Sequence, residues 1–224
     1  MTFSDFLRIA GFSSPILLLI GLIIAVFFYK RLDALYKDFA IYLFLMLFID
    51  VISRALVFLG NNNNLIILLF FSLIELIFFI NLYHKRLFKK NHVVMRIIGY
   101  IGVIYIMLEI IKYVSFGKID VREFQPYSKV ITNFIIILMT LVFFKEKIYS
   151  NAKTMIFENF YFNVIVLIYF TLNLTVFLPI NFMINESAGV KHFFWFLNLL
   201  ITLTFYLFLI IQIWRNAKSK TIKQ

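Results

Sequence analysis

The chain has 224 residues, of which 63% are hydrophobic and 20% aromatic, and it carries a formal net charge of +11. An ordinary soluble domain is about 45–50% apolar. The composition therefore excludes a water-soluble globule, and it equally excludes a disordered chain. The chain has no Cys, which excludes disulfide bonds, Cys-ligated zinc, iron–sulfur clusters and a thiol nucleophile.

Seven stretches are apolar and long enough to cross a bilayer as helices, which takes about 20 residues each. Runs such as Leu65–Phe71 are apolar at every position, which fits a helix and not the alternating strand of a barrel. The sequence therefore predicts an all-α fold, a seven-transmembrane-helix bundle that forms one domain over residues 1–224. The expected spans are 11–29, 39–59, 65–83, 93–114, 130–144, 154–184 and 192–214.

Three spans carry finer expectations. The fifth span is short, so we expect it to take residues from the loop before it. The sixth span is long enough to tilt or to kink at Pro179. In the first span Gly21 and Ala25 lie one turn apart, which predicts close packing against another helix.

Basic residues fall mainly on one side of the predicted membrane. Fifteen of the 22 Lys and Arg residues lie there, and five, including Lys129, lie on the other side. Lys and Arg are enriched in cytoplasmic loops, so we expect the N-terminus outside and the C-terminus in the cytoplasm, in a bacterial inner (cytoplasmic) membrane. Attraction to the anionic inner leaflet then explains the positive charge. The expected partners are the lipid bilayer and a cytoplasmic or membrane protein, and not nucleic acid.

Ionisable residues inside the spans are the candidate functional residues, because each costs roughly 2.5–3.5 kcal/mol near the bilayer centre. Asp50 and Arg54 share a face of the second span, Glu75 lies in the middle of the third, and Glu109 and Lys112 lie one turn apart in the fourth. Their formal charges sum to −1. Glu75 has no cation in its own span, so we expect it to hold a proton.

Neutral polar residues extend this set. Asn133 and Thr140 share a face of the fifth span, and Asn163 lies about 80° from Asn173 around the sixth. Two interpretations stay open. One is a purely structural network that joins the helices. The other is a ligand-binding pocket lined by Asp50, Arg54, Glu75, Glu109, Lys112, Asn173 and Asn198.

Several functional classes lack their signatures. The last span has no Lys for a retinal Schiff base, and the chain has neither a His-Glu-x-x-His zinc motif nor a Gly-rich phosphate loop. No nucleophile–base pair stands out. We therefore expect no enzymatic activity, no metal site and no cofactor.

Four short patterns resemble a family of uncharacterised seven-helix integral membrane proteins of Bacteroidetes-type bacteria. They are the Ile49-Asp50 pair, the Asn61–Asn64 turn, Leu73-Ile74-Glu75, and the aromatic segment His192–Asn198. Some members of that family are encoded beside sensor kinase genes, so the resemblance implies a sensing or accessory role.

These observations predict a membrane sensor or small-ligand-binding protein that signals to a partner through its cytoplasmic loops. One alternative is a proton- or ion-coupled transporter or pore with Glu75 and Asp50 as carriers. A second alternative is a non-catalytic accessory subunit of the membrane, in which the polar network only holds the fold.

Overall fold

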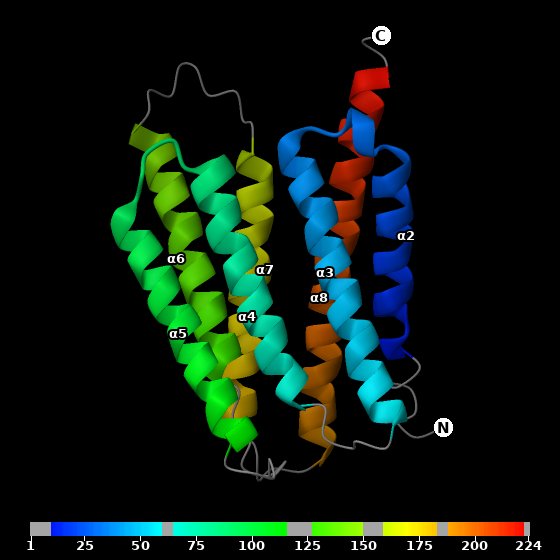
Figure 1. Ribbon diagram of the computed structural model, residues 1–224, viewed down its shortest axis with the longest axis vertical. Helices are drawn as coiled ribbons and strands as arrows, with labels where there is room; N and C mark the ends of the chain where they lie inside the picture. The colour runs from blue at the N-terminus through cyan, green and yellow to red at the C-terminus, as the bar shows by residue number, and fades with distance from the viewer. Residues whose placement is uncertain (1–9, 60–64, 116–126, 150–158, 183–187, 222–224) are drawn as a thin grey trace. The chain divides into compact units, whose positions relative to one another are not determined.

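The computed structural model describes residues 10–59, 65–115, 127–149, 159–182 and 188–221. Within these ranges all regular structure is helical and there is no strand (Figure 1), so the all-α prediction is confirmed. The elements are α2 (Ser13–Phe27), the 3₁₀ turn η1 (Tyr29–Arg31), α3 (Ala34–Phe58), α4 (Leu65–Leu82), the π-helical turn η2 (Tyr83–Leu87), α5 (Val93–Ser115), α6 (Tyr127–Tyr149), α7 (Phe160–Phe182) and α8 (Ala188–Thr221).

Six of these helices are long and apolar enough to cross a membrane. The seventh, α2, is apolar but has only 15 residues, which is about 22 Å at 1.5 Å per residue and shorter than a bilayer core of about 30 Å. The first expected span, 11–29, exceeds α2 by two residues at each end, and η1 begins at Tyr29. These lengths and compositions are compatible with a multi-pass helical membrane bundle.

Four other spans differ from their expected bounds by several residues. The second, expected at 39–59, is α3, which begins at Ala34, and the seventh, expected at 192–214, is α8, which extends from Ala188 to Thr221. The fifth, expected at 130–144, is α6 and has 23 residues, so it does extend into the preceding loop and also reaches Tyr149. The sixth, expected at 154–184, is α7, which has Pro179 inside it. Positions 154–158 and 183–184 of that expected span lie outside the described residues.

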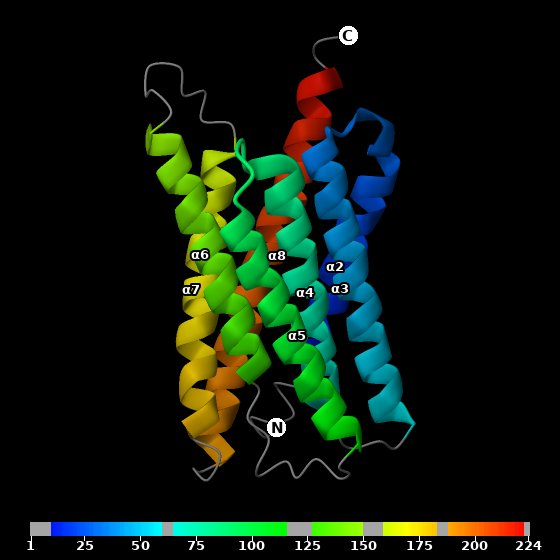
Figure 2. The same cartoon turned by 60° about the vertical axis from the view of Figure 1, so that its left-hand side comes forward.

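The helices form two compact units. The first unit contains α2, η1, α3 and α8, and in it α2 packs against both α3 and α8. The second unit contains α4, η2, α5, α6 and α7, and in it α6 packs against the other three helices. Figures 1 and 2 show the helices of each unit side by side. The single domain expected from the sequence stays a prediction.

Small residues let these helices approach closely. A Cβ atom on Gly21 of α2 would lie 2.6 Å from Ile210 of α8, which confirms the packing expected of this residue. In the second unit, a Cβ on Gly99 of α5 would lie 2.8 Å from Ile80 of α4, and one on Gly102 would collide with Ile135 of α6. Such close backbone contacts are typical of helices that associate in lipid.

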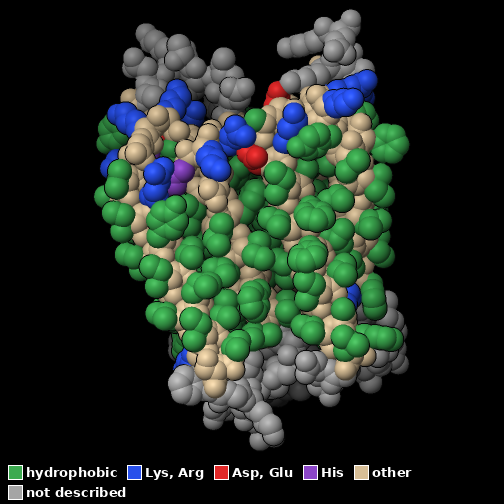
Figure 3. All heavy atoms as spheres, viewed as in Figure 1, with side chains coloured by type: hydrophobic (Ala, Val, Ile, Leu, Met, Phe, Trp, Pro, Cys, Tyr) green, Lys and Arg blue, Asp and Glu red, His purple; other side chains and the backbone are tan. Residues whose placement is uncertain are grey.

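The exposed faces of the helices are apolar. On α5, Val94, Ile101, Ile104 and Leu108 are 59–69% exposed, and their spacing places them on one face of the helix. Apolar side chains cover the sides of the helices in Figure 3. Polar side chains such as those of Ser72, Glu75 and Lys129 are buried instead. This inverts the pattern of a soluble protein and fits hydrocarbon as the solvent.

Each unit has one strongly basic end. In the first unit, the side-chain amide of Asn216 donates to Asp33 Oδ2 at 2.7 Å, which joins the end of α8 to the start of α3. This end carries Lys30, Arg31, Lys37, Arg215 and Lys218. In the second unit, the end where α4 meets α5 carries Lys85, Arg86, Lys89, Lys90, Arg96, Lys145 and Lys147 (Figure 3).

Candidate functional site

The polar centre of the second unit is an ion pair between α4 and α6. Nζ of Lys129 lies 2.5 Å from Oε2 of Glu75, and the two side chains are 2% and 0% exposed. The ammonium group also lies 4.5 Å from the centroid of the Phe71 ring, on α4. A buried charge without a partner is very costly, so each of these residues makes the burial of the other possible.

This pair adds a partner to the third span and corrects one expectation about the fifth. Glu75 has no cation in its own span, but α6 supplies Lys129. Lys129 was counted with the loop before the fifth span, whereas α6 begins at Tyr127 and takes Lys129 into the helix. The physical reason is that a long side chain near a helix end can turn inward when another helix offers it a carboxylate.

Neighbouring hydroxyl groups join the same two helices through the backbone. Thr132 Oγ1 donates to the carbonyl oxygen of Ser72 at 3.3 Å, and Ser72 Oγ donates to that of Leu68 at 2.8 Å. Both side chains are fully buried. These hydroxyls are satisfied by the fold and are not available to a ligand.

A second polar set joins η2, α6 and α7 nearer the basic end. Tyr83 Oη donates to Asn163 Oδ1 at 2.8 Å and lies 2.7 Å from Thr140 Oγ1. Nδ2 of Asn163 donates to the carbonyl oxygen of Asn159 at 2.8 Å. Because Thr140 and Asn163 both reach the same hydroxyl, they lie at the same depth. They therefore fix the register of α6 against α7.

Two more carboxamides of the second unit are buried without partners. Asn133 on α6 and Asn173 on α7 are each 0% exposed. Neither the nitrogen nor the oxygen of either carboxamide has a hydrogen-bond partner among the described residues. Leaving such a group unsatisfied costs about 1–3 kcal/mol, so these two groups call for a physical explanation.

The register places Asn173 at the depth of the ion pair. α6 and α7 pack side by side and run in opposite directions (Figures 1 and 2). Asn173 lies ten residues, or about 15 Å, from Asn163. Ten residues back from Thr140 along α6 is Val130, which lies between Lys129 and Asn133.

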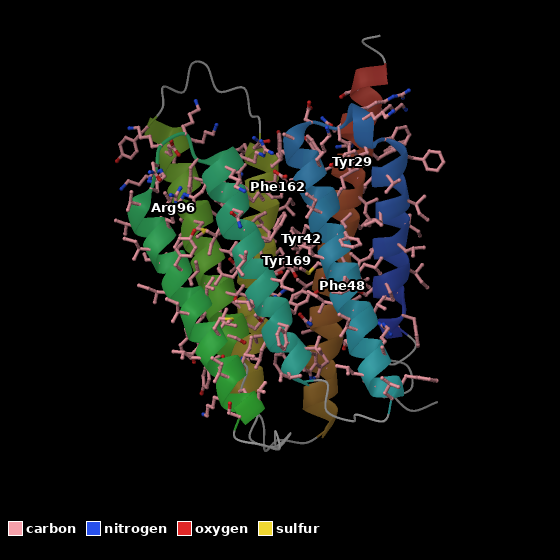
Figure 4. The ribbon with its side chains drawn as sticks, viewed as in Figure 1. Tyr29, Tyr42, Phe48, Arg96, Phe162 and Tyr169 are labelled. Carbon is pink, nitrogen blue, oxygen red and sulfur yellow. The ribbon has the colours of Figure 1, made fainter. Side chains whose placement is uncertain are left out.

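The positions of these residues around α6 and α7 also place them on neighbouring faces. At 100° per residue, Lys129, Asn133 and Thr140 lie within about 40° of one another on α6. The buried residues of α7, which include Phe162 and Tyr169 (Figure 4), cover about 140°, and Asn173 lies near the centre of that arc. The ion pair and the two carboxamides therefore border one interior region of the second unit.

An aromatic contact lies between this region and the Tyr83 set. The rings of Phe79 on α4 and Phe170 on α7 meet edge to face with centroids 5.0 Å apart. Phe79 lies one turn from Glu75 and one turn from Tyr83. The two rings therefore add an apolar contact between α4 and α7 at a depth between Glu75 and Tyr83.

Asp50 and Arg54 form the predicted pair in the first unit. Nε of Arg54 lies 3.3 Å from Oδ1 of Asp50, with side chains 33% and 23% exposed. Nη2 of Arg54 donates to the carbonyl oxygen of Gly11 at 2.7 Å, and the guanidinium lies 4.7 Å from the Phe12 ring centroid. The pair thus ties α3 to the residues before α2. Asn198 is half-buried on α8 of the same unit.

Glu109 and Lys112 lie near the end of α5 in the second unit. Backbone N–H groups of Ser128 and Tyr127 hydrogen-bond to the Glu109 carboxylate at the start of α6, a position that favours an anion. Lys112 is exposed, with Nζ 6.0 Å from the centroid of the Tyr113 ring. The seven predicted residues therefore divide between the units, with Asp50, Arg54 and Asn198 in the first and Glu75, Glu109, Lys112 and Asn173 in the second.

Comparisons with protein-family models, with curated proteins and with solved structures give no match. Any function proposed for this chain therefore has to come from its geometry, above all that of the second unit. Sequence reasoning missed Lys129 and Tyr83 as members of its polar network. A signal for Lys129 was its position one residue before the fifth span, within reach of the membrane interior.

We expect the Glu75–Lys129 pair to behave as a coupled unit in stability measurements. Lys129→Met or Glu75→Gln alone should lower the free energy of unfolding by about 3–5 kcal/mol, because each leaves an uncompensated buried group. The double variant should lose much less than the sum. SDS titration in mixed micelles, followed by circular dichroism, measures these values.

The control for this cycle is Asp50→Asn, which removes a partly exposed ion pair and should cost less than about 1 kcal/mol. If Lys129→Met cost no more than Asp50→Asn, the burial of the Lys129 ammonium group would be contradicted.

Proposed function

We propose that this chain is a multi-pass protein of a bacterial inner membrane that binds a small polar ligand inside the α4–α7 unit. Ligand binding would be passed to a protein partner through the basic cytoplasmic ends of the helices. The sensing role that the family resemblance implies is consistent with this proposal.

The observation that carries the proposal is the pair of unsatisfied carboxamides. Asn133 and Asn173 together offer amide donors and carbonyl acceptors in a fully buried region. A purely structural network would have paired them, as Asn163 is paired with Tyr83 and with the backbone. A ligand that hydrogen-bonds to both would recover the free energy that their burial costs.

The charges of the region indicate the class of ligand. Glu75 and Lys129 neutralise each other, so a ligand that carries a net charge would find no counter-charge and would pay for its desolvation. The carboxamides themselves are neutral. We therefore propose a small uncharged molecule that has several hydroxyl or amide groups.

The distribution of cations supports the proposed orientation. Each unit has one basic end, and the chain leaves the other end of the first unit at Phe58 to enter the second at Leu65. If the basic ends face the cytoplasm, the N-terminus lies outside and the C-terminus inside. In this orientation α6 starts on the outer side of the membrane. The interior region, which is near the start of α6, then lies in the outer half of the membrane.

We expect Asn173→Leu to stabilise the protein and to abolish ligand binding. Leu has a similar volume and removes an unsatisfied amide, so the ligand-free variant should gain about 1–3 kcal/mol. A thermal-shift screen of the purified protein against uncharged polyols, amides and sugars should find a member that stabilises the wild type and leaves Asn173→Leu unchanged.

Asn163→Leu is the matched control on the same helix, since it removes a carboxamide that is fully paired. It should lower stability, in contrast to Asn173→Leu. If Asn173→Leu lowered stability as much, the amide would be structural and the accessory role would replace ligand binding.

The absence of Cys allows a clean test of orientation. Lys30→Cys and Lys90→Cys, at the basic ends, should react with a membrane-impermeant maleimide only after the cells are permeabilised. Leu59→Cys and Ser115→Cys, at the opposite ends, should react in intact cells. The reverse labelling in either unit would contradict the orientation proposed for that unit.

Transport is the alternative that the buried carboxylate of Glu75 favours, because intramembrane carboxylates can carry protons. Our proposal predicts no proton flux in proteoliposomes that hold the protein and an enclosed pH dye. A flux that Glu75→Gln abolished, in a variant that keeps its helical circular dichroism, would replace binding by proton-coupled transport.

A further inference from the structure

The turn between α4 and α5 is held in place by one carboxylate of α6. Glu146 Oε1 accepts hydrogen bonds from the backbone N–H groups of Lys89 at 3.1 Å and Lys90 at 2.9 Å. Its Oε2 lies 3.4 Å from Nε2 of His92. The side chain of Glu146 is only 10% exposed. This single residue therefore fixes both the backbone and an imidazole of the turn.

Aromatic packing fixes the same turn from the inside. The ring of Phe88 lies edge to face with that of His92, with centroids 4.7 Å apart. It also lies 5.3 Å from the ring of Tyr83 and 5.4 Å from that of His84. The turn is therefore a built structure from which the neighbouring basic side chains project.

The basic side chains of the turn point to solvent. Lys85, Lys89, Lys90 and Arg96 are all exposed, and residues 83–96 contain no Asp or Glu. Glu146 is already engaged by backbone N–H groups and His92. The turn thus presents a dense positive surface. Lys and Arg side chains gather at the upper ends of the helices in Figure 3, and Figure 4 labels Arg96 near the upper end of α5.

An exposed apolar face begins directly beside these cations. Val93, Val94, Ile97 and Ile101 of α5 are 52–69% exposed. At 100° per residue they share one side of the helix, and Arg96 adjoins that side. Cations at the end of a lipid-facing helix and an apolar stripe beneath them match the two parts of a phospholipid.

We propose that the α4–α5 turn and the start of α5 form a binding site for an anionic phospholipid. Lys89, Lys90 and Arg96 bind the phosphate headgroup, and the acyl chains lie along the exposed face of α5. Glu146 is a positioning residue that holds the turn. This site is separate from the interior region and does not depend on the proposed function.

A lipid explains both halves of the surface, whereas an acidic protein segment or inorganic phosphate explains only the cations. The apolar stripe continues along α5 to Ile104 and Leu108, as acyl chains require. Juxtamembrane clusters of Lys and Arg are in general attracted to anionic lipids.

The test uses native mass spectrometry of the full chain in detergent, with short-chain phosphatidylglycerol and phosphatidylcholine as probes. The wild type should retain phosphatidylglycerol preferentially. Lys89→Gln/Lys90→Gln should weaken this binding about 25-fold, or about fivefold for each cation. The matched control, Lys30→Gln/Lys37→Gln in the first unit, makes the same charge change and should leave tight binding at the turn intact.

Glu146→Ala separates a built site from simple charge attraction. The substitution raises the net charge by one, so charge attraction alone predicts stronger binding of phosphatidylglycerol. A positioned turn predicts weaker binding, by about fivefold or more. Hydrogen exchange of the amides of Lys89 and Lys90 should increase in the same variant and so report release of the turn.

Four results would overturn the proposal. They are equal retention of the two lipids by the wild type, an equal loss in the first-unit control, unchanged or stronger binding in Glu146→Ala, and tighter binding of inorganic phosphate or polyglutamate than of the lipid. Any of these would leave the interior region and its Asn173→Leu test unaffected.

Discussion

A polar group inside hydrocarbon has no water to bond with, so its partner has to come from the protein. This constraint accounts for the main contacts between helices in both units. Lys129 joins α6 to α4 through Glu75, and Arg54 joins α3 to the carbonyl of Gly11. Glu109 joins α5 to the start of α6. Each contact joins two different segments of the chain. The charged groups therefore specify which helices pack together and at what depth.

The carboxamides of Asn133 and Asn173 are exceptions to this rule, because they have no hydrogen-bond partner among the described residues. A few such groups occur in native proteins, and they are concentrated at sites where function outweighs stability. Asn133 and Asn173 border the same interior region as a neutralised ion pair, and the Phe79–Phe170 contact lies between that pair and the Tyr83 set. Their position in the interior of one unit, instead of at a frayed end, is the reason why we propose a binding site and not imperfect packing.

Length and apolar runs were enough to predict the helices, because bilayer thickness sets how long a span has to be. They could not predict partners, since pairing depends on register and helix face. Lys129 illustrates this. A span that is taken to begin at the first apolar residue, position 130, leaves Lys129 in the preceding loop. Tyr83 joins the members of one polar set, but in the sequence it cannot be distinguished from an ordinary aromatic residue at the membrane interface. The shortness of α2 follows from η1, a local turn that hydropathy does not reveal.

The same two helices carry the interior region and the basic turn. α6 holds Lys129 near its start and Glu146 near its end, about 25 Å apart at 1.5 Å per residue, and α4 holds Glu75 and leads into η2. A ligand shifts an equilibrium only by binding one arrangement better than another. A ligand that changed the spacing of α4 and α6 at Glu75 would also change how Glu146 meets Lys89 and Lys90. If the proposed ligand binds in the interior region, α6 would connect that region to the basic surface, because it makes a contact near each of its ends.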